Sequence, residues 1–167
     1  MGSLHTPREP DAEDASRRFA DVGAVDWWAR RGWQATTSSD RLIMFIDEEV
    51  RPLLTVRRLW TTPVTVARRS GAPLTDDLVL FIQIAEKSEM LFDDGGTVLL
   101  DAGAIVFCTS RRIVRVSSAP PFSAHIEVVV SGLRLPGVLA GSGRLAIPDA
   151  TSSPFRNALV ALVNVIL

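Results

Sequence analysis

Short segments in which apolar and polar residues alternate dominate the middle of the chain. They are rich in β-branched and aromatic residues, and glycine, proline or acidic turn residues bound them, as in "VTVARRS" and "DLVLFIQIAE". Eight or so of these segments follow one another at intervals of about 8–12 residues, roughly between residues 41 and 131. Spacing of this kind predicts an antiparallel β-sandwich or barrel.

Helical patterns flank this region. A weak 3.6-residue periodicity over Ala12–Arg31 predicts an N-terminal helix, and "GLRLPGVLAG" is compatible with one short helical turn. Pro154 begins a better helix that extends to Leu167. We expect its apolar face to pair with a second copy of the chain through these residues: Leu159, Leu162, Val163 and Ile166.

The domain organisation follows from these patterns. Residues 1–12 are polar and rich in proline and acidic groups, which predicts a disordered leader. Residues 13–167 are predicted to form one domain, mainly β with flanking helices, in which helical segments occupy about 133–167. A chain of 167 residues is long enough for a single domain with a proper core.

Charge and composition narrow the possible partners. The net charge of −1 gives the chain no general attraction to nucleic acids or anionic membranes. The sequence has neither an apolar signal segment nor a run of eighteen apolar residues, so we expect a cytoplasmic protein without a membrane partner. The single cysteine, Cys108, lies in an apolar run, which predicts a buried and unreactive thiol.

Catalytic and metal-binding patterns are missing from the sequence. Only His5 and His125 occur, no His-x-His is present, and His125 with Glu127 offers two donors on one strand face without a third. The sequence has no G-x-S-x-G and no phosphate loop. We therefore expect neither an enzyme nor a bound metal or cofactor.

Arginines offer the better candidates for a binding site. Because side chains alternate along a strand, Arg68 shares a face with Val64 and Val66, and Arg57 shares one with Leu59. An arginine on the apolar side of a strand can hold a ligand carboxylate or phosphate. The predicted ligand-binding residues are Arg57, Trp60, Arg68 and His125; the alternative is that the arginines pair with surface aspartates and that Trp60 is ordinary packing.

A tight corner is predicted in "VLLDAGAIVFCTSRR". Gly103 can adopt the left-handed backbone conformation that a corner between two strands requires, without steric cost from a Cβ atom. We interpret this turn as structural rather than as a binding site.

Three segments resemble a known family. Leu53–Arg69, Asp76–Arg112 and Phe122–Leu135 resemble the N-terminal, cupin-like β-barrel or jelly-roll domain of AraC-type transcription regulators. The chain departs from the family pattern at Asp101–Ala104, where Leu-x-Pro-Gly-Asp is usual, and at Arg111–Arg112, where Arg-Pro is usual.

The resemblance implies a sensor that binds a small-molecule effector and forms a homodimer. In the family, DNA is bound by a separate pair of helix-turn-helix units, and no segment of this chain reads as a basic recognition helix. We expect contact with DNA only through a C-terminal domain that this chain lacks. Two alternatives remain, a stand-alone cupin-fold module that binds small molecules or partners without catalysis, and a metal-dependent cupin enzyme.

Overall fold

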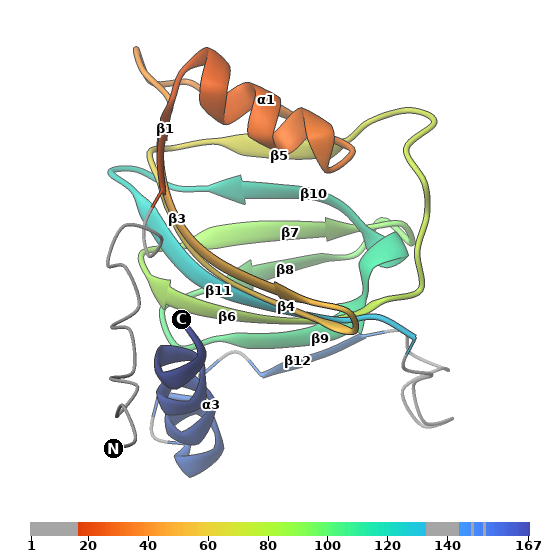
Figure 1. The fold of residues 1–167 in the computed structure, drawn as a ribbon, viewed down its shortest axis with the longest axis vertical. Helices are drawn as coiled ribbons and strands as arrows, with labels where there is room; N and C mark the ends of the chain where they lie inside the picture. Colours follow the sequence, from red (N-terminus) through yellow and green to blue (C-terminus); the bar gives the residue numbers. More distant parts are fainter. Residues whose placement is uncertain (1–16, 133–143, 148, 152) are drawn as a thin grey trace, which may run out of the picture.

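The computed structural model describes residues 17–132, 144–147, 149–151 and 153–167. Within them the chain forms two antiparallel sheets that face each other (Figure 1). The seven-stranded sheet has the order β1 (Arg17–Ala20), β3 (Ile43–Arg51), β4 (Leu54–Thr61), β11 (Ser123–Val130), β6 (Leu78–Ala85), β9 (Ile105–Thr109), β12 (Arg144–Ile147). The five-stranded sheet has the order β2 (Trp33–Thr36), β5 (Thr65–Arg68), β10 (Ile113–Ser118), β7 (Ser88–Phe92), β8 (Thr97–Leu100).

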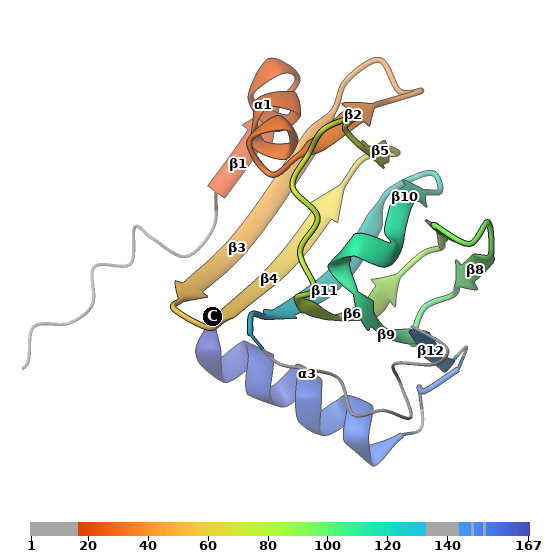
Figure 2. The same ribbon diagram turned by 90° about the vertical axis from the view of Figure 1, so that its right-hand side faces the viewer.

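Both faces of the seven-stranded sheet are covered at its centre. On β6, Val79 and Phe81 belong to the core between the sheets, whereas Leu80 and Ile82 belong to a second cluster that packs against helix α3 (Pro154–Ile166). This arrangement explains why "LVLFIQIA" is an almost continuous apolar run, since a strand covered on both sides has no solvent-facing row of side chains. Figure 2 shows α3 beneath the sheet, on the side away from the five-stranded sheet.

Helix α1 (Val22–Arg30) covers the edge at which the two sheets approach each other. Its residues Trp27 and Trp28 are buried in one cluster with Met44 of β3 and Val66 of β5, so the helix packs against strands of both sheets. Figure 2 shows α1 next to β1 and β2 at this edge. The short 3₁₀ turn η1 (Ser110–Arg112) connects β9 to β10.

The predicted fold class, mainly β with flanking helices, is confirmed. Two details differ from the sequence prediction. The described strands form two open sheets rather than one closed barrel. Strands also occur outside the predicted region of 41–131, since β1 lies within the segment predicted as helix, β2 follows α1, and β12 lies within 133–167. These strands have four residues each, which is too short for a periodic sequence signal, and their pairing partners decide their conformation.

The predicted corner at Gly103 is confirmed. Gly103 has φ 95, and its N–H donates to the carbonyl of Gln83 over 2.8 Å. A Cβ atom at this position would lie 2.3 Å from Cγ2 of Thr151, so the glycine also lets the C-terminal segment lie close to the turn. Asp101, at the start of the turn, forms an ion pair with Lys87.

Two predictions fall wholly or mainly on residues outside the described ranges, namely the leader at 1–12 and the helical turn in "GLRLPGVLAG". The helices that the structure does describe are all too short or too polar to cross a membrane.

Candidate functional site

A cavity of about 380 Å³ lies between the two sheets. Its wall is largely apolar, and side chains of both sheets supply it: Val64, Val66, Val79, Phe81, Met90, Ile113, Val116 and Val129. The C-terminal end of α1 and the residues that follow it contribute Trp28, Arg31 and Trp33. Size and composition of this kind are typical of sites for small molecules.

Charged side chains cross the seven-stranded sheet on the cavity side. Arg57 of β4 is the register partner of Glu48 on β3 and of Glu127 on β11, so the three residues lie side by side on neighbouring strands. The Nε of Arg57 donates to Glu48 Oε1 over 2.6 Å, and its Nη1 donates to Glu127 Oε2 over 3.2 Å. Arg31 adds a second guanidinium, with Nη2 at 2.8 Å and 3.0 Å from the two oxygens of Glu48.

Mutual pairing keeps these groups ionised. Burial by itself raises the pKa of Glu127, but His125 and Arg57 outweigh this effect and hold that pKa at about 2. Burial likewise raises the pKa of Glu48, yet hydrogen bonds and charge from Arg57 and Arg31 bring it below its usual value. Burial lowers the pKa of Arg57, and the two carboxylates raise it above its usual value. Two cations and two anions therefore balance within this network.

His125 lies beside the network and is not fully bonded. Its ring stacks on Phe81 with centroids 4.4 Å apart, and its Nε2 is 3.6 Å from Glu127 Oε1, which is too long for a hydrogen bond. Four buried polar atoms of the cavity wall have no hydrogen-bond partner among the described residues: both ring nitrogens of His125, Nε1 of Trp28 and Oγ1 of Thr61. The three side chains line the cavity, and their residues are only 7%, 5% and 3% exposed.

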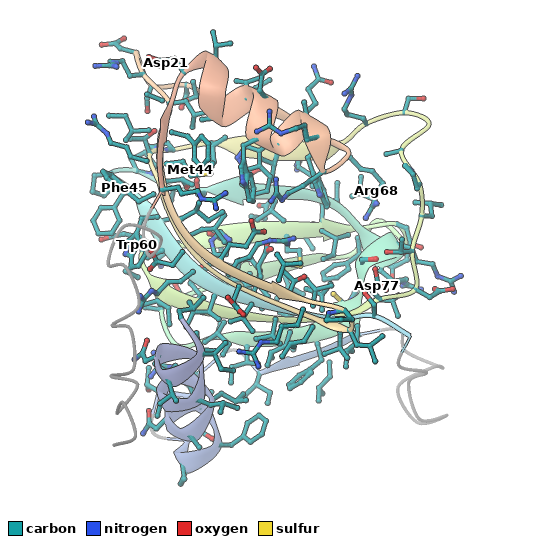
Figure 3. The ribbon with its side chains drawn as sticks, viewed as in Figure 1. Asp21, Met44, Phe45, Trp60, Arg68 and Asp77 are labelled. Carbon is teal, nitrogen blue, oxygen red and sulfur yellow. The ribbon has the colours of Figure 1, made fainter. Side chains whose placement is uncertain are left out.

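Arg68 lies at the opposite sheet, at the end of β5. Its Nε donates to the carbonyl of Ile113 over 3.0 Å, and its Nη2 donates to the same carbonyl and to that of Ser110. Its guanidinium also lies over the ring of Trp33, 4.8 Å from the centroid. In Figure 3, Arg68 and Asp77 lie at the right-hand end of the strands, and both residues line the cavity.

Three of the four predicted ligand-binding residues line this cavity, namely Arg57, Arg68 and His125. Trp60 does not. It lies three positions after Arg57 along β4, so it points to the opposite, outer face of the sheet. There it lines a separate hollow with Phe45 and Phe122. Figure 3 shows Phe45 and Trp60 at the left of the molecule, at the end opposite Arg68.

The predicted dimerisation residues are divided between two faces of α3. Val163 is buried, and Leu159 and Ile166 pack with it against the outer face of the seven-stranded sheet. Leu162 is 54% exposed. The helix carries apolar residues on both sides, so its periodicity does not tell which side packs on its own sheet. The exposed side bears Phe155, Leu162 and Val165.

Sequence reasoning missed several residues of the cavity wall and of the charge network beside it. Thr61 follows Arg57 and Leu59 at two-residue steps on β4, so the alternation that selected Arg57 also places Thr61 on the cavity side. Glu48 and Trp28 have no comparable signal, because their positions depend on strand register and on helix packing.

The described residues around the cavity do not provide the ligand set of a metal centre. Across the part of the chain that the structure describes, no group of three or more His, Cys, Asp or Glu side chains could hold a metal ion. His125 and Glu127 provide two donors, but Glu127 is bonded to Arg57. Cys108 is buried in the core, as its apolar neighbours predict, and burial raises the pKa of its thiol to about 12.

Similarity to solved structures identifies the fold. The AraC-like transcriptional activator CuxR matches with a TM-score of 0.55 at 11% identity, over 70% of this chain and 47% of that protein. The described strands therefore share the fold of the matched part of CuxR, with two antiparallel sheets that face each other. Two further structures match with a TM-score of 0.42 each. They are the EutQ protein of Clostridium difficile (14% identity, 54% of this chain and 69% of that protein) and a cupin superfamily protein of Desulfitobacterium hafniense (6% identity, 59% and 77%).

The matched region thus spans about half the length of CuxR. No family model and no curated protein matches the sequence.

Proposed function

We propose that this chain is the effector-sensing and dimerisation domain of an AraC-type transcription regulator, and that it has no catalytic activity of its own. One observation carries the proposal, namely the cavity between the sheets with its unpartnered polar atoms on Trp28, Thr61 and His125. A buried polar group without a partner costs about 1–3 kcal/mol. A ligand that bonds to these atoms would remove that cost.

The fold supports a regulatory role. The likeness to CuxR covers about half of that AraC-like activator, which leaves room there for a separate domain. We propose that DNA binding belongs to such a separate domain and that this chain contacts DNA only through it. A cytoplasmic location is expected for this role and stays a prediction.

The two faces of β4 and β11 offer a route from ligand to helix. Arg57 and Glu127 face the cavity, while their strand neighbours Val56 and Ile126 belong to the cluster beneath α3. A ligand that favours one arrangement of these strands therefore also favours one arrangement of α3. The proposed mechanism is a population shift in which effector binding and helix position are coupled.

We propose that α3 pairs with the α3 of a second copy through its exposed side. Phe155, Leu162 and Val165 repeat at intervals typical of helix pairs, and the only charged residue of the helix is Arg156. A face without charges does not select a charged partner, whereas two copies of it can meet without repulsion.

Ligand binding is tested by the melting temperature of the chain in a broad collection of small molecules. We expect at least one class of ligand to raise it, because a ligand that binds only the folded state stabilises that state. Val116→Phe would place a ring in the cavity and abolish the increase. Val50→Phe is the matched control on the exposed part of β3 and should preserve it. If no ligand raises the melting temperature of the unmodified chain, the sensor proposal is wrong.

Dimerisation is tested by light scattering at tens of micromolar protein. We expect a dimer for the unmodified chain and a monomer for Leu162→Glu. Val22→Glu alters an apolar residue of α1 that is also exposed, and this variant should remain dimeric. A monomer for the unmodified chain would refute the helix pair.

A further inference from the structure

We propose that the ligand of the cavity is a small organic anion, whose carboxylate or phosphate group binds the guanidinium of Arg68 and whose apolar body lies between the sheets. This inference rests on the proposed function, because it assigns a chemical class to the ligand of the same cavity.

The hydrogen bonding of Arg68 leaves a free pair of donors. A guanidinium has five N–H groups. The one on Nε and the two on Nη2 are directed to the carbonyls of Ser110 and Ile113. The two on Nη1 have no hydrogen-bond partner among the described residues, while the two carbonyls hold the group in a fixed orientation. An oxygen of a ligand can bind Nη1 without displacing any contact of the protein.

The charge of Arg68 is also not compensated. Arg57 and Arg31, which line the same cavity, each pair with a carboxylate, but no carboxylate of the described residues lies within 4.0 Å of Arg68. Burial lowers the pKa of Arg68, and no acidic neighbour opposes this effect, in contrast to Arg57. A half-buried cation without a counter-ion is the environment in which an anionic ligand gains most.

The unpaired charges of the cavity wall also favour an anionic ligand. After Arg31 and Arg57 are paired with Glu48 and Glu127, the remaining charged residues of the wall are Arg30, Arg68 and Asp77. Neither Arg30 nor Asp77 makes an ion pair with another described residue. Two cations against one anion leave this wall positive, so it attracts an anion.

The remainder of the wall requires that the anion has an apolar body. Val66, Val79 and Met90 are buried and line the space between the sheets. An inorganic ion would leave these surfaces without contacts, whereas a hydrocarbon or aromatic body would cover them. The indole N–H of Trp28 and the hydroxyl of Thr61 can then bond to a second polar group of the ligand.

The test compares matched acids and neutral amides on the full 167-residue chain. Hexanoate and phenylacetate are compared with hexanamide and phenylacetamide, phenyl phosphate represents the phosphate head group, and benzylamine represents a cation. Dissociation constants are measured by nuclear magnetic resonance titration at neutral pH. We expect at least one anion to bind at least about tenfold more tightly than its neutral counterpart, because its bond to Arg68 is charge-assisted. The dissociation constants of the carboxylates and of phenyl phosphate show which head group the site prefers.

Variants assign the preference to Arg68. In Arg68→Met the preference for acid over amide should fall to less than about twofold, and in Arg68→Lys it should persist in weaker form. Arg111→Met is the matched control, because Arg111 is exposed, pairs with Asp76 and does not line the cavity. If Arg68→Met does not fold, two measurements still decide the inference. They are the comparison of acids with amides on the unmodified chain and the same comparison on Arg68→Lys.

The outcomes separate the two proposals. If the amides or benzylamine bind as tightly as the acids, the anionic class is overturned while the sensor proposal stands. If acids are preferred and Arg68→Met keeps the full preference, the assignment to Arg68 is overturned. If neither these probes nor the broad collection bind, the sensor proposal and this inference fall together.

Discussion

Glu127 provides the sharpest test of the buried charge network. The substitution Glu127→Gln keeps the shape of the side chain and removes its charge. Arg57 would still pair with Glu48, so of the two ion pairs of Arg57 the substitution removes only the one with Glu127. We expect the variant to be less stable at neutral pH by about 1–3 kcal/mol, because a buried charged hydrogen bond is lost.

The pH dependence follows from the lowered pKa of this carboxyl. A pKa that falls from 4.5 to about 2 on folding corresponds to about 3 kcal/mol of stability. Because the folded-state pKa is the lower one, this stability is complete above the unfolded value and is lost as the pH falls towards the folded value. Between pH 6 and pH 3.5 the expected loss is about 1 kcal/mol.

The assay is urea unfolding, followed by circular dichroism, of both proteins at these two pH values. Other acidic groups titrate in both proteins, so the difference between the two losses isolates Glu127. We expect the unmodified chain to lose about 1 kcal/mol more than Glu127→Gln. Glu89→Gln is the control, since the ion pair of Glu89 with Arg115 is at the surface, and it should lose as much as the unmodified chain. Equal losses in the unmodified chain and Glu127→Gln would refute the described role of Arg57 and His125.

Three further predictions concern stability and reactivity. Gly103→Ala should lower the free energy of unfolding by about 1–3 kcal/mol, because alanine is strained at the positive φ of this position and its Cβ would meet Thr151. A change below about 0.5 kcal/mol in urea unfolding would contradict the geometry of this corner. Val163→Ala should lower the free energy of unfolding by about 1–3 kcal/mol in the same assay, because Val163 is buried. Val22→Ala, at an exposed position, should lower it by less than about 0.5 kcal/mol. Equal losses would show that α3 does not pack on the sheet. Cys108 should react with Ellman's reagent at pH 8 only after urea is added, because its thiol is buried and burial raises its pKa to about 12. Rapid reaction of the folded chain would contradict the burial.

Strand alternation accounts for the part of the cavity that could be predicted. Arg57 and Arg68 each lie an even number of positions from apolar residues of the same strand, so they share a face with those residues. Both arginines line the cavity. The same rule places Trp60 on the face opposite to Arg57. The sequence alone could therefore have excluded Trp60 from the predicted ligand-binding residues. Alternation says nothing about which residues of different strands meet. The pairing of Arg57 with Glu48 and Glu127 depends on the register of β3, β4 and β11.

The sequence by itself determined the mainly β class, the corner at Gly103 and the C-terminal helix, because these depend on periodicity and on the backbone freedom of single residues. Only the tertiary structure decided three other features: the strand at Arg144–Ile147, the side of α3 that packs on its own sheet, and the atoms left unpartnered in the cavity. Each of these depends on contacts between segments far apart in the chain. Local pattern does not carry that information, because the same short apolar segment can pair or pack in more than one way.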